Sequence, residues 1–288
     1  MLLCIQLSGH AQQKRALIIC VGEQEDKSWE DINAENDLRY VIDVLDYYRY
    51  GDVVTLEGKQ ATKSNIVAAF RSLSSRCRQD DIVYVHFSGH GQRMTDVDGD
   101  EVVRRAKDKY DESWIPYDAY LEYGSNDKGD RHLSDDEIAV LLRDVKKKIG
   151  VNGEILVVVD ACHSGGSTRG REDDADNFCI RGVENFFVIP EASLTSIGTH
   201  QESAVQKEEW LTLSACTDYQ SNTECSLPVV GRLTYALYQL KRRLGAMSNE
   251  ELIRAVKGKI NSYSPALDME QTPILSDYKC DISRFFQR

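Results

Sequence analysis

The sequence predicts an α/β fold in which helices cover both faces of a mostly parallel sheet. Its strongest apolar runs are continuous rather than alternating, which is typical of strands that are buried on both faces. These runs alternate along the chain with segments of helical period. With 288 residues and 41% hydrophobic content, the chain is long enough for one sizeable core or for two closely packed subdomains.

The first half of the chain is expected to contribute three strands and two helices. The run RALIICVG predicts a buried strand at 15–22. A helix is expected from about Asn33 to Arg49, because Leu38, Val41 and Leu45 share one face with Ile42. The next expected elements are a strand at 52–58, a helix at 62–77 capped by Thr62, and a strand at 80–91 that ends in a glycine loop.

The second half continues the same alternation after one interruption. A helix is expected at 134–148, where an acidic start and a basic end suit the helix dipole. The polar, turn-rich segment 165–209 is long for a loop in a compact domain, so it is either functional or disordered. The other expected elements are strands at 154–166, 209–218 and 272–277 and helices near 231–243 and 248–261.

Charge and cysteine usage narrow the class of protein. The 35 basic and 47 acidic residues give a net charge of −12, which argues against a nucleic-acid or membrane-surface binder. No apolar run approaches the roughly 18 to 20 residues that span a bilayer, and the start of the chain lacks the features of a signal peptide. The eight cysteines lack zinc-module spacing. We therefore expect a cytoplasmic protein with mostly buried, unpaired cysteines.

Two strand ends carry residues suited to nucleophilic catalysis. His90 lies at the end of one expected strand and Cys162 at the end of another, and the carboxyl ends of neighbouring parallel strands meet at one edge of a sheet. A cysteine thiol with a pKa of about 8.5 needs a nearby base to attack at neutral pH. His163 is poorly placed for this role, because successive side chains leaving a strand point to opposite sides. The spacing predicts a catalytic pair of Cys162 and His90.

These residues lie in motifs that resemble a known family. HFSGHGQ and VVVDACHSGG resemble the His and Cys signatures of the metacaspases and related caspase-like cysteine peptidases. The resemblance extends from about residue 15 to residue 277. It includes the segments NAENDLRYVIDVL, YDESWIPYDA, SDDEIAVLL, LTLSACTDYQSN and GRLTYAL.

The resemblance implies a caspase-like three-layer sandwich with a six-stranded, mostly parallel sheet. It divides one catalytic domain into an extension at 1–14, a large-subunit-like region at 15–164, an intersubunit-type linker at 165–209 and a small-subunit-like region at 210–288. It also implies a cysteine endopeptidase that works through an acyl-enzyme. Cys162 would be the nucleophile, His90 the general base and acid, and the backbone N–H groups of Gly91 and Cys162 the oxyanion hole.

A specificity pocket and its substrates follow from the same resemblance. The acidic pocket of the metacaspases matches Asp37, Asp160 and Ser88, and such a pocket selects Arg or Lys before the cut bond. The expected partners are therefore protein or peptide substrates with a basic residue at the cleavage site, and the chain is expected to be a monomer. The sequence departs from many metacaspases at Ala34, where they carry a second cysteine.

The resemblance also implies calcium as an activator, with no cofactor needed for the chemistry. The segment 96–101 hints at an EF-hand loop, but Glu101 and Lys107 stand where that loop needs Gly and Glu. Many metacaspases bind calcium through scattered aspartates instead. The best matches for these are Asp111, Asp135, Asp136 and either Asp173 or Asp174.

The linker contains basic residues that an enzyme of this specificity could cut. Where caspase-like enzymes are often processed, this chain has Arg169, Arg171, Arg181 and Lys207, and we expect self-cleavage among them.

Two other interpretations remain open at this stage. One is a caspase-like regulatory or binding protein with little or no catalytic activity. The other is a metalloenzyme that uses His86, His90, Cys162 and His163 as ligands, although these residues lack any standard zinc spacing.

Overall fold

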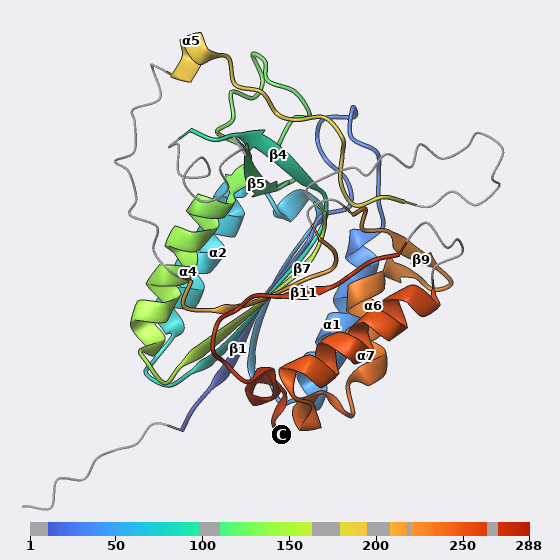
Figure 1. Ribbon diagram of the computed structural model, residues 1–288. Helices are drawn as coiled ribbons and strands as arrows, with labels where there is room; N and C mark the ends of the chain where they lie inside the picture. Colours follow the sequence, from blue (N-terminus) through green and yellow to red (C-terminus); the bar gives the residue numbers. More distant parts are fainter. Residues whose placement is uncertain (1–10, 98–109, 163–178, 195–207, 218–219, 264–269) are drawn as a thin grey trace, which may run out of the picture.

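The computed structural model describes residues 11–97, 110–162, 179–194, 208–217, 220–263 and 270–288 (Figure 1). It confirms the predicted fold class. One six-stranded sheet runs through the molecule in the order β11-β8-β7-β3-β1-β2. Its parallel strands are β1 (Lys14–Cys20), β2 (Asp52–Glu57), β3 (Ile82–Ser88), β7 (Glu154–Asp160) and β8 (Leu211–Ser214). The edge strand β11 (Ile274–Leu275) is antiparallel.

Helices cover both faces of this sheet and bury two apolar cores against it. One face carries α1 (Asp37–Tyr47), α6 (Arg232–Leu240) and α7 (Asn249–Ser262), and the other carries α2 (Lys63–Arg76) and α4 (Asp135–Ile149) (Figure 1). Along β1 and β3, alternate apolar side chains enter opposite cores, so both strands contain continuous apolar runs. No helix within the described residues is long and apolar enough to cross a lipid bilayer.

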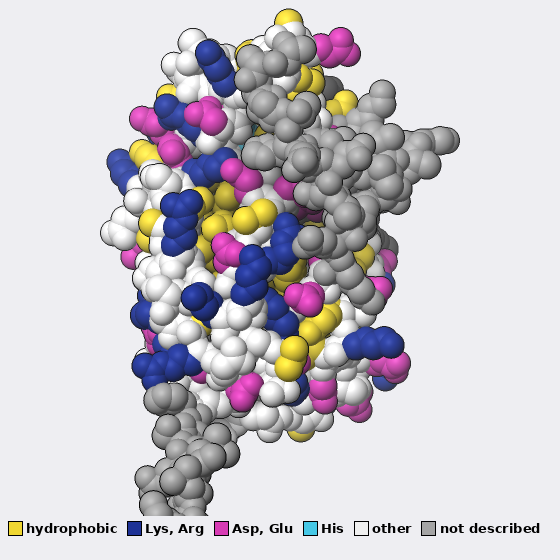
Figure 2. All heavy atoms as spheres, turned by 90° about the vertical axis from the view of Figure 1, so that its left-hand side faces the viewer, with side chains coloured by type: hydrophobic (Ala, Val, Ile, Leu, Met, Phe, Trp, Pro, Cys, Tyr) yellow, Lys and Arg dark blue, Asp and Glu magenta, His cyan; other side chains and the backbone are white. Residues whose placement is uncertain are grey.

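The outward face of α2 and α4 is a mixed surface. Basic, acidic and apolar side chains are interspersed there, so this face presents no field of a single sign (Figure 2).

Local sequence signals explain where several helices begin. Thr62 caps α2 by accepting a hydrogen bond from the Asn65 N–H, as predicted. Ser134 and Glu137 form a capping box at the start of α4. The predicted helix at 33–49 is shorter than expected, because its first turn is the 3₁₀ helix η1 (Ala34–Asn36).

Smaller elements lie beyond the main sheet. They are too short for a hydrophobic periodicity to predict them from the sequence. A three-stranded sheet contains β4 (Gly91–Thr95), β5 (Tyr110–Trp114) and β6 (Leu133–Ser134). A hairpin contains β9 (Glu224–Ser226) and β10 (Val229–Gly231). The other short helices within the described residues are α5 (Glu191–Leu194), η2 (Gly58–Gln60), η3 (Leu244–Ala246) and η4 (Ile282–Phe286).

Candidate active site

The two predicted catalytic residues lie at the carboxyl ends of adjacent strands. In the β3–β7 register, Ser88 pairs with Asp160. His90 and Cys162 each follow two residues later, and both are buried. The parallel pairing of β3 with β7 therefore brings the imidazole and the thiol to the same edge of the sheet.

The hydrogen bonding of His90 defines its tautomer. Its Nε2 lies 2.8 Å from the carbonyl oxygen of Glu30, and a carbonyl can only accept, so the ring proton is assigned to Nε2. The Nδ1 atom is buried and has no hydrogen-bond partner among the described residues. Burial lowers the pKa of His90 to about 4, although the bond to Glu30 opposes this. His90 is thus a neutral imidazole at pH 7 with a lone pair on Nδ1, which is the form of a general base.

A peptide bond of the chain itself lies against the nucleophile. The N–H of Cys162 donates a 2.8 Å hydrogen bond to the carbonyl oxygen of Arg181. Gly182 forms a parallel β-bridge with Gly91. A Cβ added at Gly182 would lie only 2.5 Å from the Sγ of Cys162. The Arg181 carbonyl therefore occupies the place where a substrate carbonyl would meet the N–H of Cys162.

The side chain of Arg181 fills a buried acidic pocket. Its Nη1 and Nη2 atoms lie 2.6 and 3.0 Å from the two oxygens of Asp37. Its Nε and Nη2 atoms lie 3.2 and 3.0 Å from Oε1 of Glu224. The carboxylate of Asp160 is more distant, at 3.7 Å from Nη1, while its backbone carbonyl lies at 3.3 Å. All four side chains are almost completely excluded from solvent.

The N-terminus of α6 holds two of these carboxylates. The Gly231 N–H donates to Asp37, and the Thr234 N–H donates to Asp160. The hydroxyl of Thr234 lies 3.1 Å from Asp37 and 2.7 Å from Asp160, so it bridges the pair. Asn222 donates a further bond to Asp160. Backbone N–H groups at a helix N-terminus stabilise anions, so α6 favours the ionised carboxylates.

The charges in the pocket stabilise one another. Burial alone would raise the pKa of Asp37, but the charge of Arg181 and the bonds from Arg181, Gly231 and Ser88 outweigh it and lower that pKa. Burial would likewise lower the pKa of Arg181, yet Asp37, Asp160 and Glu224 raise it well above its ordinary value. A cation is therefore strongly favoured in this pocket.

The structure brings the predicted pocket residues together and adds one that the sequence did not reveal. Asp37 and Asp160 both surround Arg181, whereas Ser88 donates a 2.7 Å bond to Asp37 and acts on the cation through that carboxylate. Glu224 was missed. It lies on β9, in a segment without clear periodicity, and no local motif marks it.

Residues 179–189, which we call the strap, continue from the pocket along β4. The Phe187 N–H donates to the carbonyl of Arg93, and the Thr95 N–H donates to the carbonyl of Phe187. A β-bridge pairs Met94 with Phe187. The strap thus pairs with the strand that leaves His90, and this pairing holds Arg181 at the active site.

Two further side chains belong to the hydrogen-bond networks around the catalytic pair and the acidic pocket. A hydrogen bond with Cys162, together with burial, raises the pKa of Cys216 well above its ordinary value. Burial lowers the pKa of His86 to about 4, and its Nε2 lies 3.0 Å from Ser88 and 3.2 Å from Thr234. His86 therefore belongs to the hydrogen-bond network beneath the acidic pocket. Its proposed zinc partner His163 lies outside the described residues.

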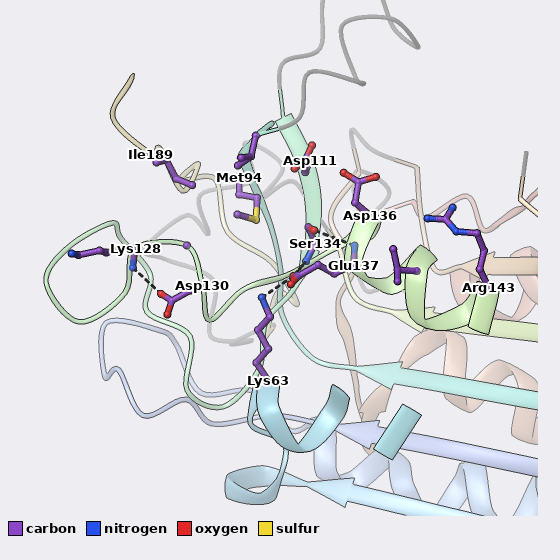
Figure 3. A pocket seen from close by; sticks show the side chains of 13 residues that line it. Lys63, Met94, Asp111, Lys128, Asp130, Ser134, Asp136, Glu137, Arg143 and Ile189 are labelled. Carbon is purple, nitrogen blue, oxygen red and sulfur yellow. Dashed lines mark hydrogen bonds and ion pairs between the residues drawn. The ribbon is translucent and has the colours of Figure 1, made fainter. Parts of the chain in front are cut away.

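An acidic cluster lies at the start of α4. Asp111, Asp135 and Asp136 each place one carboxylate oxygen within 4.8 Å of the others, and Asp111 is buried. In Figure 3, Asp111 on β5 and Asp136 at the start of α4 point to the same side, while Glu137 turns away to pair with Lys63. Among the described residues, this is the one group of three with the spacing of metal ligands.

The cluster borders a cavity. The cavity of about 730 Å³ is lined by Asp111 and Asp136 together with Met94 and the strap residue Ile189 (Figure 3). The remaining candidates, Asp173, Asp174, Arg169, Arg171 and Lys207, lie outside the described residues.

Comparisons with known proteins agree with this architecture. A family model described as the caspase domain matches residues 13–281. Metacaspase-1B of Aspergillus terreus is 34% identical over 125 residues, which cover 41% of this chain and 29% of that protein. Metacaspase-1 of Schizosaccharomyces pombe is 26% identical over 237 residues, which cover 70% of this chain and 52% of that protein. The matched residues thus span about half or less of these relatives.

Solved structures share the fold at low sequence identity. A crystal structure of a Geobacter sulfurreducens protein superposes with a TM-score of 0.64 at 20% identity, covering 96% of this chain and 97% of that chain. Caspase-1 of Spodoptera frugiperda gives a TM-score of 0.59 at 13% identity, covering 93% of this chain and 89% of that chain.

Proposed function

The chain belongs to the caspase domain family of cysteine peptidases, as its two signatures predicted, and we propose that it hydrolyses peptide bonds after basic residues. One observation carries the specificity. The buried pocket beside Cys162 holds the side chain of an arginine, and the carbonyl of that same arginine accepts a hydrogen bond from the Cys162 N–H. A substrate bound in this way would present its bond after Arg or Lys to the thiol.

We assign the chemistry to His90 and Cys162, which lie at the same edge of the sheet, because the Nδ1 lone pair of His90 has no hydrogen-bond partner among the described residues. Nδ1 of His90 takes the thiol proton as Sγ of Cys162 attacks the carbonyl carbon, and the oxyanion is stabilised by the Cys162 N–H. Collapse of this intermediate breaks the C–N bond, and His90 returns the proton to the leaving amine. Water, deprotonated by His90, then hydrolyses the thioester and releases the new carboxylate.

Self-cleavage at Arg181 is the second part of the proposal. The sequence offers four basic candidates in the linker, and among the described residues Arg181 lies in the acidic pocket with its following peptide bond against Cys162. A group held in this way in cis reacts as though it were at high concentration. As long as Arg181 occupies the pocket, it would also exclude other substrates.

Calcium is the third part of the proposal. Three carboxylates fit a hard cation that prefers oxygen ligands, so Asp111, Asp135 and Asp136 would hold it. Asp111 pairs with Met94 in the β4–β5 register, and Met94 in turn bridges Phe187 of the strap. An ion at this cluster would therefore act on the strand that seats the strap, and it would stimulate activity without taking part in bond cleavage.

Substitution of the nucleophile tests the activity. We expect wild type to hydrolyse a short peptide ending in Arg before a fluorogenic leaving group, and Cys162→Ala to show no turnover. Cys77→Ala, which removes a buried cysteine in the core between α2 and the sheet, is the matched control and should retain activity. Turnover that persists in Cys162→Ala would refute the proposal, and absence of turnover in fully processed wild type would favour a regulatory caspase-like protein.

Mass spectrometry of the same proteins tests self-cleavage. Wild type should accumulate a new N-terminus at Gly182, and Cys162→Ala should remain intact. A cut at Gly182 in the Cys162→Ala protein incubated alone would show that another protease makes it.

Calorimetry tests the metal site. We expect calcium to bind wild type, and Asp136→Asn to weaken binding by about tenfold or more because one of three carboxylates loses its charge. Asp144→Asn, an exposed change on the same helix, is the control. Equal calcium binding by Asp136→Asn and wild type would rule out this cluster.

A further inference from the structure

We propose that Glu224 makes the acidic pocket select arginine over lysine. The inference rests on the proposed function, because it takes Arg181 as the stand-in for a substrate residue. It goes further, because it narrows the substrate class and assigns that choice to a residue with no signature in the sequence.

The contacts of Arg181 account for all the polar hydrogens of a guanidinium. Asp37 accepts from Nη1 and Nη2 at the end of the fork. Glu224 accepts from Nε and Nη2 along its side. The second proton of Nη1 faces the backbone carbonyl of Asp160 at 3.3 Å. The five N–H donors of the arginine thus have five acceptor contacts in the planar geometry that suits this side chain.

A lysine could reproduce only part of this arrangement. Its ammonium lies close to where the central carbon of the guanidinium would be, and a methylene takes the place of Nε. The buried carboxylate of Glu224 would then face a C–H group in place of two N–H donors. A buried carboxylate that loses two of its charged hydrogen-bond donors is destabilised, so the pocket should discriminate against lysine.

Glu224 is held in position by a residue outside the strap. The Asn33 N–H donates to Oε1 of Glu224 at 2.8 Å, and Nδ2 of Asn33 donates to Oε2 at 2.9 Å. The Glu224 side chain is only 3% exposed. Because Asn33 orients the carboxylate, its position should persist when a substrate replaces Arg181. Asp37 and Asp160 then attract any cation, whereas Glu224 recognises the side of a guanidinium.

The test compares two peptides that differ only in Arg or Lys before the cut bond. Both compete with Arg181 for the same pocket, so the ratio of their kcat/KM values within one preparation does not depend on how many pockets the strap occupies. In wild type we expect a preference for Arg of about tenfold or more. In Glu224→Gln the ratio should fall about tenfold, mainly because kcat/KM for the Arg peptide decreases. Glu35→Gln is the control, since Glu35 also accepts a backbone N–H, from Gly22, outside the pocket.

A third peptide requires no mutation. It carries an arginine isostere in which a methylene replaces Nε, so the fork that meets Asp37 is kept and one donor to Glu224 is lost. We expect wild type to cleave it several-fold more slowly than the Arg peptide, and Glu224→Gln to reduce this difference. Equal Arg-to-Lys ratios in wild type and Glu224→Gln, or an isostere cleaved as fast as Arg by wild type, would overturn the inference. Failure of wild type to cleave any of the peptides would instead refute the proposed function.

Discussion

Replacement of Arg181 by alanine should have opposite effects on stability and on activity. The substitution removes the cation from among Asp37, Asp160 and Glu224, which are all buried. Loss of one partner from a buried ion pair typically costs 3–5 kcal/mol. Water can enter the emptied pocket, so we place the loss in free energy of unfolding at the lower end, at about 3 kcal/mol.

The stability measurement needs a protein that cannot cut itself. Urea unfolding of Cys162→Ala is compared with that of the same protein carrying Arg181→Ala, followed by circular dichroism. Because the charge of Arg181 lowers the pKa of Asp37, its removal should raise that pKa and make the loss of stability smaller in acid than at pH 7. Arg242→Ala, at an exposed position, is the control and should change stability by less than about 0.5 kcal/mol.

The activity measurement uses the intact catalytic pair. A residue tethered in cis competes at an effective concentration of about millimolar, so its removal should lower the KM of a short Arg peptide by about tenfold or more. A merely structural arginine would give a loss of stability without any gain of activity. If Arg181→Ala hydrolyses the peptide no better than unprocessed wild type, Arg181 does not occupy the substrate pocket as we infer.

Three other expectations follow from the site. His86 and His90 have pKa values of about 4 in the folded state, against about 6.5 in the unfolded state. The unfolded state therefore binds more protons between these two pH values, and each histidine should lower the free energy of unfolding by about 3 kcal/mol as the pH falls from 6.5 to 4. Urea titrations at several pH values measure this loss. Gly182→Ala places a Cβ 2.5 Å from the Sγ of Cys162, so mass spectrometry should show slower self-cleavage while short peptides are still hydrolysed. Thr234→Val removes the hydroxyl that bridges two buried carboxylates and should lower kcat/KM for Arg peptides about tenfold.

The sequence predicted the layers of the fold and the place of the catalytic pair because both depend on local signals. Continuous apolar runs mark β1, β3 and β7, which are covered on both faces. The cap at Thr62 marks the start of α2. His90 and Cys162 follow directly from strand ends, so the parallel register alone brings them to one edge.

Contacts between distant segments could not be predicted in the same way. Nothing near Arg181 distinguishes it from the other basic residues of the linker, since its burial depends on Asp37, 144 positions earlier. Glu224 lies on a three-residue strand whose pairing is decided by tertiary contacts. Asp160 was expected to read the substrate charge, yet much of its hydrogen bonding goes to Thr234 and Asn222. Which atoms of the cation each of the three carboxylates contacts is therefore decided only in the folded protein.

The same contacts indicate that one cut would not empty the pocket. Cleavage after Arg181 separates it from Gly182 and from the β4 pairing, but the guanidinium keeps its contacts with Asp37 and Glu224. Arg181 also stays attached to Cys162, only 19 positions earlier in the chain, so it would compete with substrates at high effective concentration. A second cut between these residues, at Arg169 or Arg171, would release the arginine on a short peptide. We therefore expect full activity to follow the appearance of that peptide rather than the first cut.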